Sequence, residues 1–287
     1  MKKIKIKSML RLWTVFAGLV LSACVTERPA TSPSLRLYAF NCGSIGVQDV
    51  SVFHPGLGKD QYKLLTNSCY LIVHPKGSLM WDAGLPDALV QIPEGKTAYK
   101  IFNFRVTKTL ASQLKEIGVA PESVNYLGIS HMHGDHNGNS HLFPRATLLM
   151  QKEEYAAAFG PEPAKYGFDP SNYPTLRSNI VKLLEGDHDV FGDGAVVIKR
   201  TLGHTPGHQA LFVKLAKSGN ILLSGDFVHF TDNWVHKRVP GFNFDQEQSR
   251  KTMQEMEAFL KVNQATLWIQ HDLEQNATIR HAPAFYE

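Results

Sequence analysis

Four apolar segments of this chain each run directly into a side chain that can bind a metal ion. VNYLGIS, AVVIKRTLG, NILLSG and ATLWIQ read as buried β-strands, and the residues that follow them are His131, His204, Asp226 and His271. Sites in layered sheet proteins tend to gather beyond the carboxyl ends of strands. Four coincidences of this kind therefore predict strands whose ends converge on one site.

The stretch HMHGDH adds further candidate ligands at the first of these strand ends. It places three of the 13 histidines of the chain and one aspartate within six positions, a composition from which a packed core gains nothing. The candidate ligands are then seven: His131, His133, Asp135, His136, His204, Asp226 and His271. Since a zinc ion takes about three or four protein ligands, seven exceed one shell and favour two ions.

The seven ligands divide evenly if Asp226 is shared by both ions. The first ligand group is then His131, His133 and His204, and the second ligand group is Asp135, His136 and His271. Two ions about 3.5–4 Å apart can share a hydroxide and stabilise both ends of a displacement. Imidazole and carboxylate ligands favour two zinc ions, and they also suit iron, manganese or cobalt.

Residues 1–24 resemble an export signal. MKKIKIKSMLR carries five basic residues and no acidic residue, and the apolar run LWTVFAGLVLSA is too short for a membrane-spanning helix of about 20 residues. Its end, LSAC, resembles a lipoprotein box with Cys24 as the lipidated residue; the alternative is an ordinary signal peptide with a chance cysteine. Residues 25–34 are rich in Pro, Ser and Thr and read as a flexible tether.

The expected location follows from this leader. We expect an exported lipoprotein that faces the periplasm or the cell exterior and is held to the membrane by its lipid. The outer membrane is favoured because Val25 follows the cysteine, in place of the aspartate that often retains lipoproteins in the inner membrane.

The charge balance changes once the leader is removed. The chain has 30 basic and 26 acidic residues, a formal charge of +4, and the leader accounts for five of the basic residues. The remainder holds 25 basic against 26 acidic residues, a charge of −1, which argues against a nucleic-acid-binding face. With 43% apolar residues, residues 35–287 suffice for one large domain or two halves that share a core.

Strand and helix patterns alternate through the rest of the chain. A helix is predicted over 107–117, where Gly118 ends it, and an amphipathic helix over 246–261, with Asp245 and Gln248 as a capping box. This order suggests a layered α/β or α+β architecture. Cys42 and Cys69 lie on predicted strands, where a disulfide and two buried thiols are both open.

The metal motifs resemble those of a known superfamily. HMHGDH is similar to the HxHxDH signature of the metallo-β-lactamase superfamily, and LGHTPGH, SGD and the late QHD are similar to its further metal motifs. The resemblance extends over roughly residues 35–275. It implies a four-layer αβ/βα sandwich with two metal ions at one edge between the sheets.

One branch of the superfamily matches further. CYLIVHPKGSLMWDAGLPDALV resembles the N-acyl homoserine lactonases, and this implies that Asp82 is a buried residue that orients the site; a simple turn or helix cap is the alternative. The branch commonly carries a tyrosine three residues after the shared aspartate, where this chain has His229. We expect His229 to donate a hydrogen bond to the oxyanion and not to bind metal, the alternative being a spectator at the cavity wall.

The resemblance implies a quorum-quenching activity, the opening of the lactone ring of N-acyl homoserine lactones. A hydroxide shared by the ions would attack the carbonyl carbon, and Asp135 would carry the proton to the leaving ring oxygen. The segment 91–104 is expected to form a loop near the cavity. Its Tyr99, Phe102 and Phe104 either line an acyl groove or belong to ordinary core packing.

Other members of the fold are weighed against this expectation. A β-lactamase is disfavoured because Asp226 stands where those enzymes usually carry cysteine or serine, and a nuclease is disfavoured by the charge balance. A thioesterase of the glyoxalase II type shares the ligand set and is the main alternative. A non-catalytic zinc protein needs only about four ligands, so seven speak against it.

Overall fold

The computed structural model of the protein describes Met1 and residues 34–287. The chain divides into two units, Met1–Ser32 and Pro33–Glu287, and the described elements of secondary structure all belong to the second unit. Apart from Met1 and Ser34, the expected leader with Cys24 and the expected tether over 25–34 lie outside the described residues. Among the described helices, none is long and apolar enough to cross a membrane.

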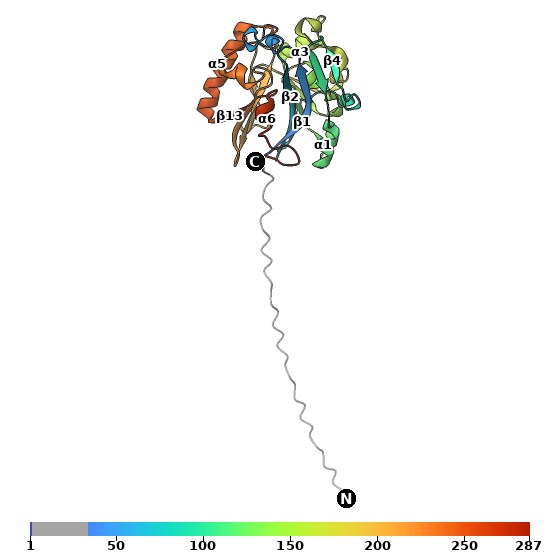
Figure 1. Ribbon diagram of the computed structural model, residues 1–287. Coiled ribbons are helices and arrows are strands. Elements are labelled where there is room, and N and C mark those ends of the chain that lie inside the picture. Colours follow the sequence, from blue (N-terminus) through green and yellow to red (C-terminus); the bar gives the residue numbers. More distant parts are fainter. Residues whose placement is uncertain (2–33) are drawn as a thin grey trace. The chain divides into compact units, whose positions relative to one another are not determined.

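Two mixed β-sheets form the centre of the described part of the chain (Figure 1). The larger sheet has the order β4-β5-β1-β2-β3-β6-β7-β8, and the smaller has the order β13-β12-β11-β10-β9. The strands of the larger sheet are β1 (Arg36–Val47), β2 (Lys63–His74), β3 (Gly77–Trp81), β4 (Lys96–Ala98), β5 (Phe102–Arg105), β6 (Tyr126–Gly128), β7 (Thr147–Gln151) and β8 (Val181–Leu184). Those of the smaller sheet are β9 (His188–Asp189), β10 (Val196–Arg200), β11 (Gln209–Leu215), β12 (Gly219–Leu223) and β13 (Ala265–Trp268).

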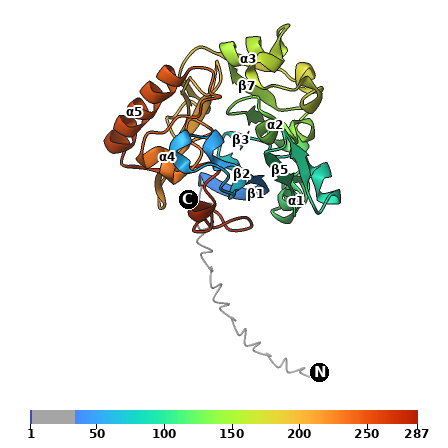
Figure 2. The ribbon, with the colours of Figure 1, turned by 45° about the horizontal axis from the view of Figure 1, so that its top comes forward.

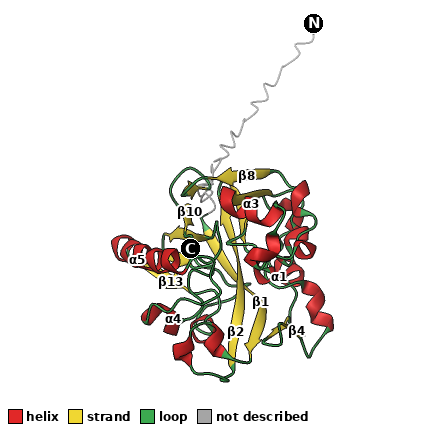
Figure 3. Cartoon of the chain, turned by 90° about the horizontal axis from the view of Figure 1, so that it is seen from above, coloured by secondary structure: helices red, strands yellow, loops and turns green. Residues whose placement is uncertain are grey.

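The helices are α1 (Leu110–Glu116), α2 (Gly134–Asn137), α3 (Lys152–Phe159), α4 (Thr231–Val235), α5 (Gln246–Asn263) and α6 (Leu273–Asn276). Of these, α1 and α3 pack on the outer face of the larger sheet, and α5 packs on the outer face of the smaller sheet. Single 3-10 turns occupy Val50–Val52, Pro55–Leu57, Asp87–Gln91, Pro121–Ser123, Ser140–Leu142, Pro163–Tyr166, Pro170–Asn172 and Leu176–Ser178. Figure 3 shows α5 on one side of the strands and α1 and α3 on the other.

The core lies in three layers that follow from the alternation of side chains along each strand. On β2, Tyr70 and Ile72 point between the sheets, whereas Cys69 and Leu71 point to the helices outside the larger sheet. Both faces of this strand are therefore buried, which explains its continuous apolar run. On the far side, Met253 of α5 packs against the smaller sheet. The order helix, sheet, sheet, helix confirms the expected four-layer αβ/βα sandwich.

The two predicted helices are present with small changes of boundary. Thr109 caps α1 by accepting a hydrogen bond from the backbone N–H of Ser112, at 3.1 Å. In α5, Asp245 accepts from the backbone N–H of Gln248 at 2.9 Å, as the capping-box pattern predicts, and the helix continues to Asn263.

The prediction of a loop over 91–104 was wrong in part, because this segment contains β4 and most of β5. Strand β5 pairs with β1, which lies more than 50 residues earlier in the chain, with Ile45 opposite Phe104. A short strand held by such a distant partner leaves little local pattern to detect.

Candidate metal centre

The register of two parallel strand pairs brings the predicted site residues together. In the larger sheet, Trp81 at the end of β3 lies opposite Gly128 at the end of β6. Asp82 follows the first strand directly, and His131 follows the second after two residues. Because the strands are parallel, both residues emerge at the same edge of the sheet.

The smaller sheet repeats this arrangement at the facing edge. Leu223 of β12 lies opposite Trp268 of β13 in a parallel pair, so Asp226 and His271 follow at the same edge. His204 lies in the connection between β10 and β11. Figure 2 turns this edge of both sheets toward the viewer, with α2 on one side of it and α4 on the other.

The first ligand group surrounds a common point. Nε2 of His131 lies 2.9 Å from Nδ1 of His133, and Nε2 of His204 lies 3.2 Å and 3.1 Å from these two atoms. His131 and His204 are buried, with 0% and 3% of their surfaces exposed. Three ring nitrogens that converge in this way could hold a metal ion.

The two carboxylate oxygens of Asp226 face the two ligand groups separately. Oδ2 lies 3.8 Å from Nε2 of His131 and 3.6 Å from Nε2 of His204. Oδ1 lies 3.4 Å from Nε2 of His136 and 3.0 Å from Nε2 of His271. One side chain therefore offers an oxygen to each group.

The second ligand group closes around Asp135. Its Oδ2 lies 3.5 Å from Nε2 of His136 and 3.6 Å from Nε2 of His271. The structure thus brings together all seven candidate ligands that the sequence indicates.

In four of the histidines, the ring nitrogen that points away from the centre forms a hydrogen bond with a protein oxygen. The pairs are His136 Nδ1 with Asp82 Oδ2 at 2.9 Å, His204 Nδ1 with Asn243 Oδ1 at 3.0 Å, His271 Nδ1 with the Thr66 carbonyl at 2.8 Å, and His133 Nε2 with the Tyr166 carbonyl at 3.0 Å. Each oxygen accepts the ring N–H and leaves the lone pair of the other nitrogen facing the centre. The carbonyl and carboxylate partners thereby select the tautomer that a metal needs.

Asp82 lies behind the second ligand group, fully buried. Its Oδ1 accepts the backbone N–H of Ser130 at 2.6 Å, and its Oδ2 accepts the Ser130 hydroxyl at 3.0 Å besides the ring of His136. The residue has a φ of +57°, in the left-handed region that non-glycine residues rarely adopt. These contacts hold the carboxylate against the ring of His136 and the strand end that carries His131.

Burial and neighbouring charges shift the pKa values of the side chains at the centre. Burial lowers the pKa of His131, His133 and His204, so these rings are neutral. Burial alone would raise the pKa of Asp226, but the surrounding histidines, led by His271, lower it well below its usual range. In the first ligand group, neutral imidazoles beside the ionised Asp226 are therefore in the protonation states in which these groups bind metal.

Buried polar atoms without partners test whether metal ions fit. Nε2 of His136 and Oδ1 of Asp226 are buried and lack a hydrogen-bond partner, although both face the centre. Buried polar atoms normally have partners, and an ion is one explanation when they do not. Four sets of three histidine or aspartate ligand atoms lie here within 4.8 Å of one another. The donor set therefore fits two ions.

His229 is buried on the side of Asp226 that faces the first ligand group. Its Nε2 lies 3.3 Å from Oδ2 of Asp226, and it joins Asp226 and His204 in one of the metal-competent sets. Its Nδ1 has no hydrogen-bond partner. The ring packs against Phe53, with 4.8 Å between the ring centroids. His229 therefore lies at the centre, where its position is compatible both with donating a hydrogen bond and with binding a metal ion.

Two buried residues at the centre escaped the sequence analysis. His208 closes the LGHTPGH motif, and its Nε2 accepts the backbone N–H of Asp226 at 2.8 Å. Glu154 lies in the first turn of α3 and contacts both histidine motifs through backbone groups. The motif itself was a signal for His208, whereas a single glutamate early in a helix gave none.

The aromatic residues of segment 91–104 pack mainly into the fold. Phe102 and Phe104 stack with their ring centroids 6.2 Å apart and pack on an apolar cluster that includes Ile45 and Phe230. Tyr99 is 79% exposed. Of the two alternatives for this segment, an acyl groove or ordinary core packing, core packing describes Phe102 and Phe104.

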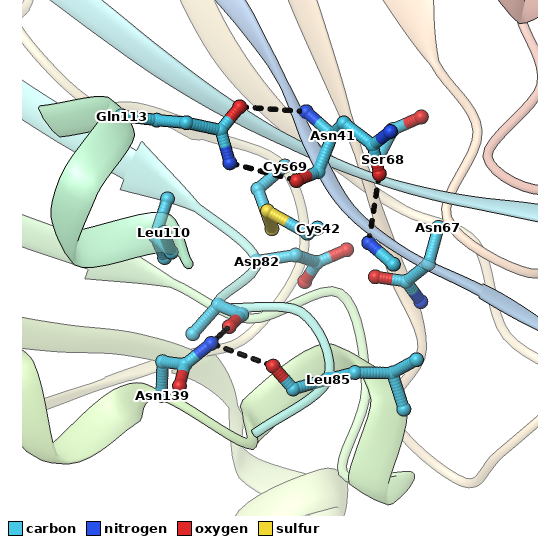
Figure 4. The surroundings of a disulfide bond; sticks show 12 residues. Asn41, Cys42, Asn67, Ser68, Cys69, Asp82, Leu85, Leu110, Gln113 and Asn139 are labelled. Atoms are coloured by element: carbon cyan, nitrogen blue, oxygen red, sulfur yellow. Dashed lines mark hydrogen bonds between the residues drawn. A yellow bond between two sulfur atoms is a disulfide. The ribbon is translucent and has the colours of Figure 1, made fainter. Parts of the chain in front are cut away.

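Cys42 and Cys69 form a disulfide between β1 and β2, so the first of the two open alternatives holds (Figure 4). The bond lies under the loop that carries Asp82. A Cβ added to Gly84 would meet Cβ of Cys42 at 2.4 Å and Sγ of Cys69 at 2.8 Å. The glycine allows this loop to lie directly on the disulfide.

Comparison with known proteins places this centre in a family context. A model of the metallo-beta-lactamase superfamily matches residues 62–265. The chain is 30% identical to the N-acyl homoserine lactonase AttM of Azorhizobium caulinodans, over 88% of this chain and 99% of that protein. It is 29% identical to the N-acyl homoserine lactonase AiiA of Bacillus thuringiensis subsp. kurstaki, over 76% of this chain and 85% of that protein.

A solved structure shows the same fold with product bound. It is an N-acyl homoserine lactone hydrolase with N-hexanoyl-L-homoserine at its catalytic metal centre. The TM-score is 0.76 with 27% identity, over 88% of this chain and 99% of the other.

Proposed function

This chain belongs to the metallo-beta-lactamase superfamily, and we propose that it is a dinuclear-metal hydrolase that opens the lactone ring of N-acyl homoserine lactones. The observation that carries the proposal is the division of the Asp226 carboxylate, whose two oxygens face separate ligand groups. The relatives named as N-acyl homoserine lactonases support the choice of substrate.

The two ions would be held by side chains whose ligand atoms already face the centre. The first ligand group with Oδ2 of Asp226 would hold one ion, and the second ligand group with Oδ1 would hold the other. Zinc is the expected metal because imidazole and carboxylate oxygen are among its usual ligands, and iron, manganese or cobalt would also fit. Bound there, a pair of ions supplies Lewis acidity and lowers the pKa of water toward neutrality.

Opening of a lactone also needs a proton for the ring oxygen as it leaves, and we propose that Asp135 supplies it. Its side chain is 15% exposed, more than those of His136 at 0% and Asp226 at 6%. Burial alone would raise the pKa of Asp135, but His136 lowers it to about 2. An ionised Asp135 accepts a proton from the attacking water and returns it to the ring oxygen, which yields an N-acyl homoserine.

His229 would support the carbonyl oxygen as it gains negative charge. The ring is held by its contact with Phe53, and its Nε2 lies beside the Asp226 oxygen that faces the first ligand group. A buried N–H aimed at a developing oxyanion stabilises the transition state more than the ground state. We propose this role for His229 in place of a ligand role.

The test compares substrate classes on one protein of known metal content. Hydrolysis of short- and long-chain N-acyl homoserine lactones would be measured beside a glutathione thioester and a β-lactam. We expect the lactones to be the preferred substrates. A preference for the thioester would move the chain to the glyoxalase II type, and a two-ion protein inert on all three classes would contradict the proposed activity.

A further inference from the structure

We propose that Glu154 is a positioning residue that fixes the two histidine motifs relative to each other and so sets the metal affinity of the first ligand group. The inference rests on the proposed function only in that this group binds an ion. Nothing in it depends on which substrate the protein hydrolyses.

Glu154 uses both carboxylate oxygens on the two motifs. Oε1 accepts the backbone N–H of Met132 at 2.8 Å. Oε2 accepts the backbone N–H of Gly207 and the hydroxyl of Thr205, each at 2.8 Å. The side chain is fully buried, and buried carboxylates are rare unless such donors hold them.

The bonded groups come from different sheets. Met132 lies between His131 and His133, in the segment that follows β6 of the larger sheet. Thr205 directly follows His204, in the connection after β10 of the smaller sheet. One carboxylate therefore bonds to the main chain between His131 and His133 and to the side chain of the residue that follows His204.

Steric contact supports the same conclusion. A Cβ added to Gly207 would lie 2.3 Å from the backbone nitrogen of Glu154 and 2.6 Å from its Cβ. The turn that carries His204 therefore rests directly on the start of α3, which only glycine permits. Hydrogen bonds and packing thus fix one register between the two motifs.

Two alternatives to a positioning role fit less well. Glu154 cannot contact substrate, because 0% of its surface is exposed. It also forms no ion pair with a lysine or arginine among the described residues. Metal sites require their ligands to be held within about 0.5 Å of the productive geometry. Removing a link between the motifs should therefore loosen the three nitrogens of this group before it affects the second ligand group.

The test is Glu154→Gln, with Glu153→Gln as the matched control. Glutamine keeps the shape but brings an NH₂ where an acceptor oxygen stood, so either Met132 or Gly207 loses the acceptor of its N–H. Glu153 is the preceding residue in α3 and pairs with Arg200 without reaching either motif. Zinc release from each holoprotein would be measured by chelator competition without substrate. The variants His133→Ala and His271→Ala would show which phase of zinc release belongs to the ion at each ligand group.

We expect Glu154→Gln to bind the ion of the first ligand group about 10- to 100-fold more weakly, with the second ion and the Glu153→Gln protein close to wild type. Equal weakening of both ions would mark a general structural role and overturn the proposal, as would wild-type release of both. If Glu154→Gln does not fold, Thr205→Val removes one donor and keeps both backbone bonds. It should then weaken the same ion by a smaller factor, and wild-type release from that variant would also overturn the proposal.

The outcome is separable from that of the proposed function. A wild type that binds two ions but does not hydrolyse lactones would refute the proposed substrate and leave the Glu154 result valid. A wild type without a bound ion at the first ligand group would refute both.

Discussion

The backbone N–H of Asp226 donates a hydrogen bond of 2.8 Å to Nε2 of His208. Nδ1 of the same ring lies 2.9 Å from the carbonyl oxygen of Thr201, to which it donates. Burial lowers the pKa of His208 to about 3, so the ring is neutral and Nε2 keeps the lone pair that accepts from Asp226. The shared carboxylate is thus held in place through its own main chain.

Replacing His208 tests this link. His208→Phe should leave the buried N–H of Asp226 without an acceptor, which costs about 1–3 kcal/mol of stability. Because Asp226 serves both ligand groups, we expect both ions to be held less tightly. Urea unfolding and zinc content would be measured, with His208→Gln as the variant that keeps an acceptor. Normal zinc content in His208→Phe would show that the hydrogen bond does not position the carboxylate.

The shared role of Asp226 predicts unequal effects of two ligand substitutions. Asp226→Ala should weaken both ions, whereas His271→Ala should mainly weaken the one at the second ligand group, because Oδ1 and Oδ2 of Asp226 face different groups. Elemental analysis of the purified proteins would count the ions. About one tightly bound ion in the wild type would speak directly against a dinuclear centre.

Substitutions at His229 distinguish a role in oxyanion stabilisation from a role as a metal ligand. His229→Ala should lower kcat on an acyl homoserine lactone by roughly 10- to 100-fold, less than loss of the principal oxyanion donor because the ions would share the load. His229→Tyr should retain much of the activity, since a phenol also donates. The exposed His236 provides the control variant His236→Ala.

Two results would revise this assignment. Wild-type turnover in His229→Ala would reduce the residue to a bystander. Loss of an ion in that variant would make His229 a ligand, a role open to it because it shares a metal-competent set with His204 and Asp226.

The stability of the metal-free protein should depend on the protonation of Glu154. Burial raises the pKa of Glu154 to about 7 from an ordinary value near 4.5. Its contribution to stability is therefore fully present below about pH 4.5 and is lost as the pH rises toward 7, by on the order of 3 kcal/mol. The glutamine of Glu154→Gln does not ionise, so the wild type should lose stability relative to this variant between about pH 4.5 and pH 7. Unfolding at several pH values would measure the difference, and a constant difference would contradict the assignment.

Cys24 provides a test of location. We propose that it is the lipidated residue of an exported protein, because LSAC follows a basic and apolar leader. Cys24→Ala should move the protein from the membrane fraction and change processing of the precursor. Unchanged fractionation and processing would refute the lipoprotein assignment.

Local sequence was sufficient to identify the seven candidate ligands that the structure brings together. HMHGDH sets four of them within six positions, and the apolar strands before His204, Asp226 and His271 indicate that these residues stand at strand ends. The helix after Asp245 was also predictable, because the cap and the apolar face lie within a few turns. Each of these features depends on residues close together in the chain.

Only the tertiary structure decided how these candidate ligands are held. The sequence gives no sign that Glu154 links two motifs more than 70 residues apart, or that Asn243 orients His204. It also left open whether Cys42 and Cys69 are joined and missed β5, whose partner is a distant strand. Local patterns determine which element a segment forms, whereas these contacts depend on the register of strands and turns far apart in the chain. That register is set by packing of the whole sandwich.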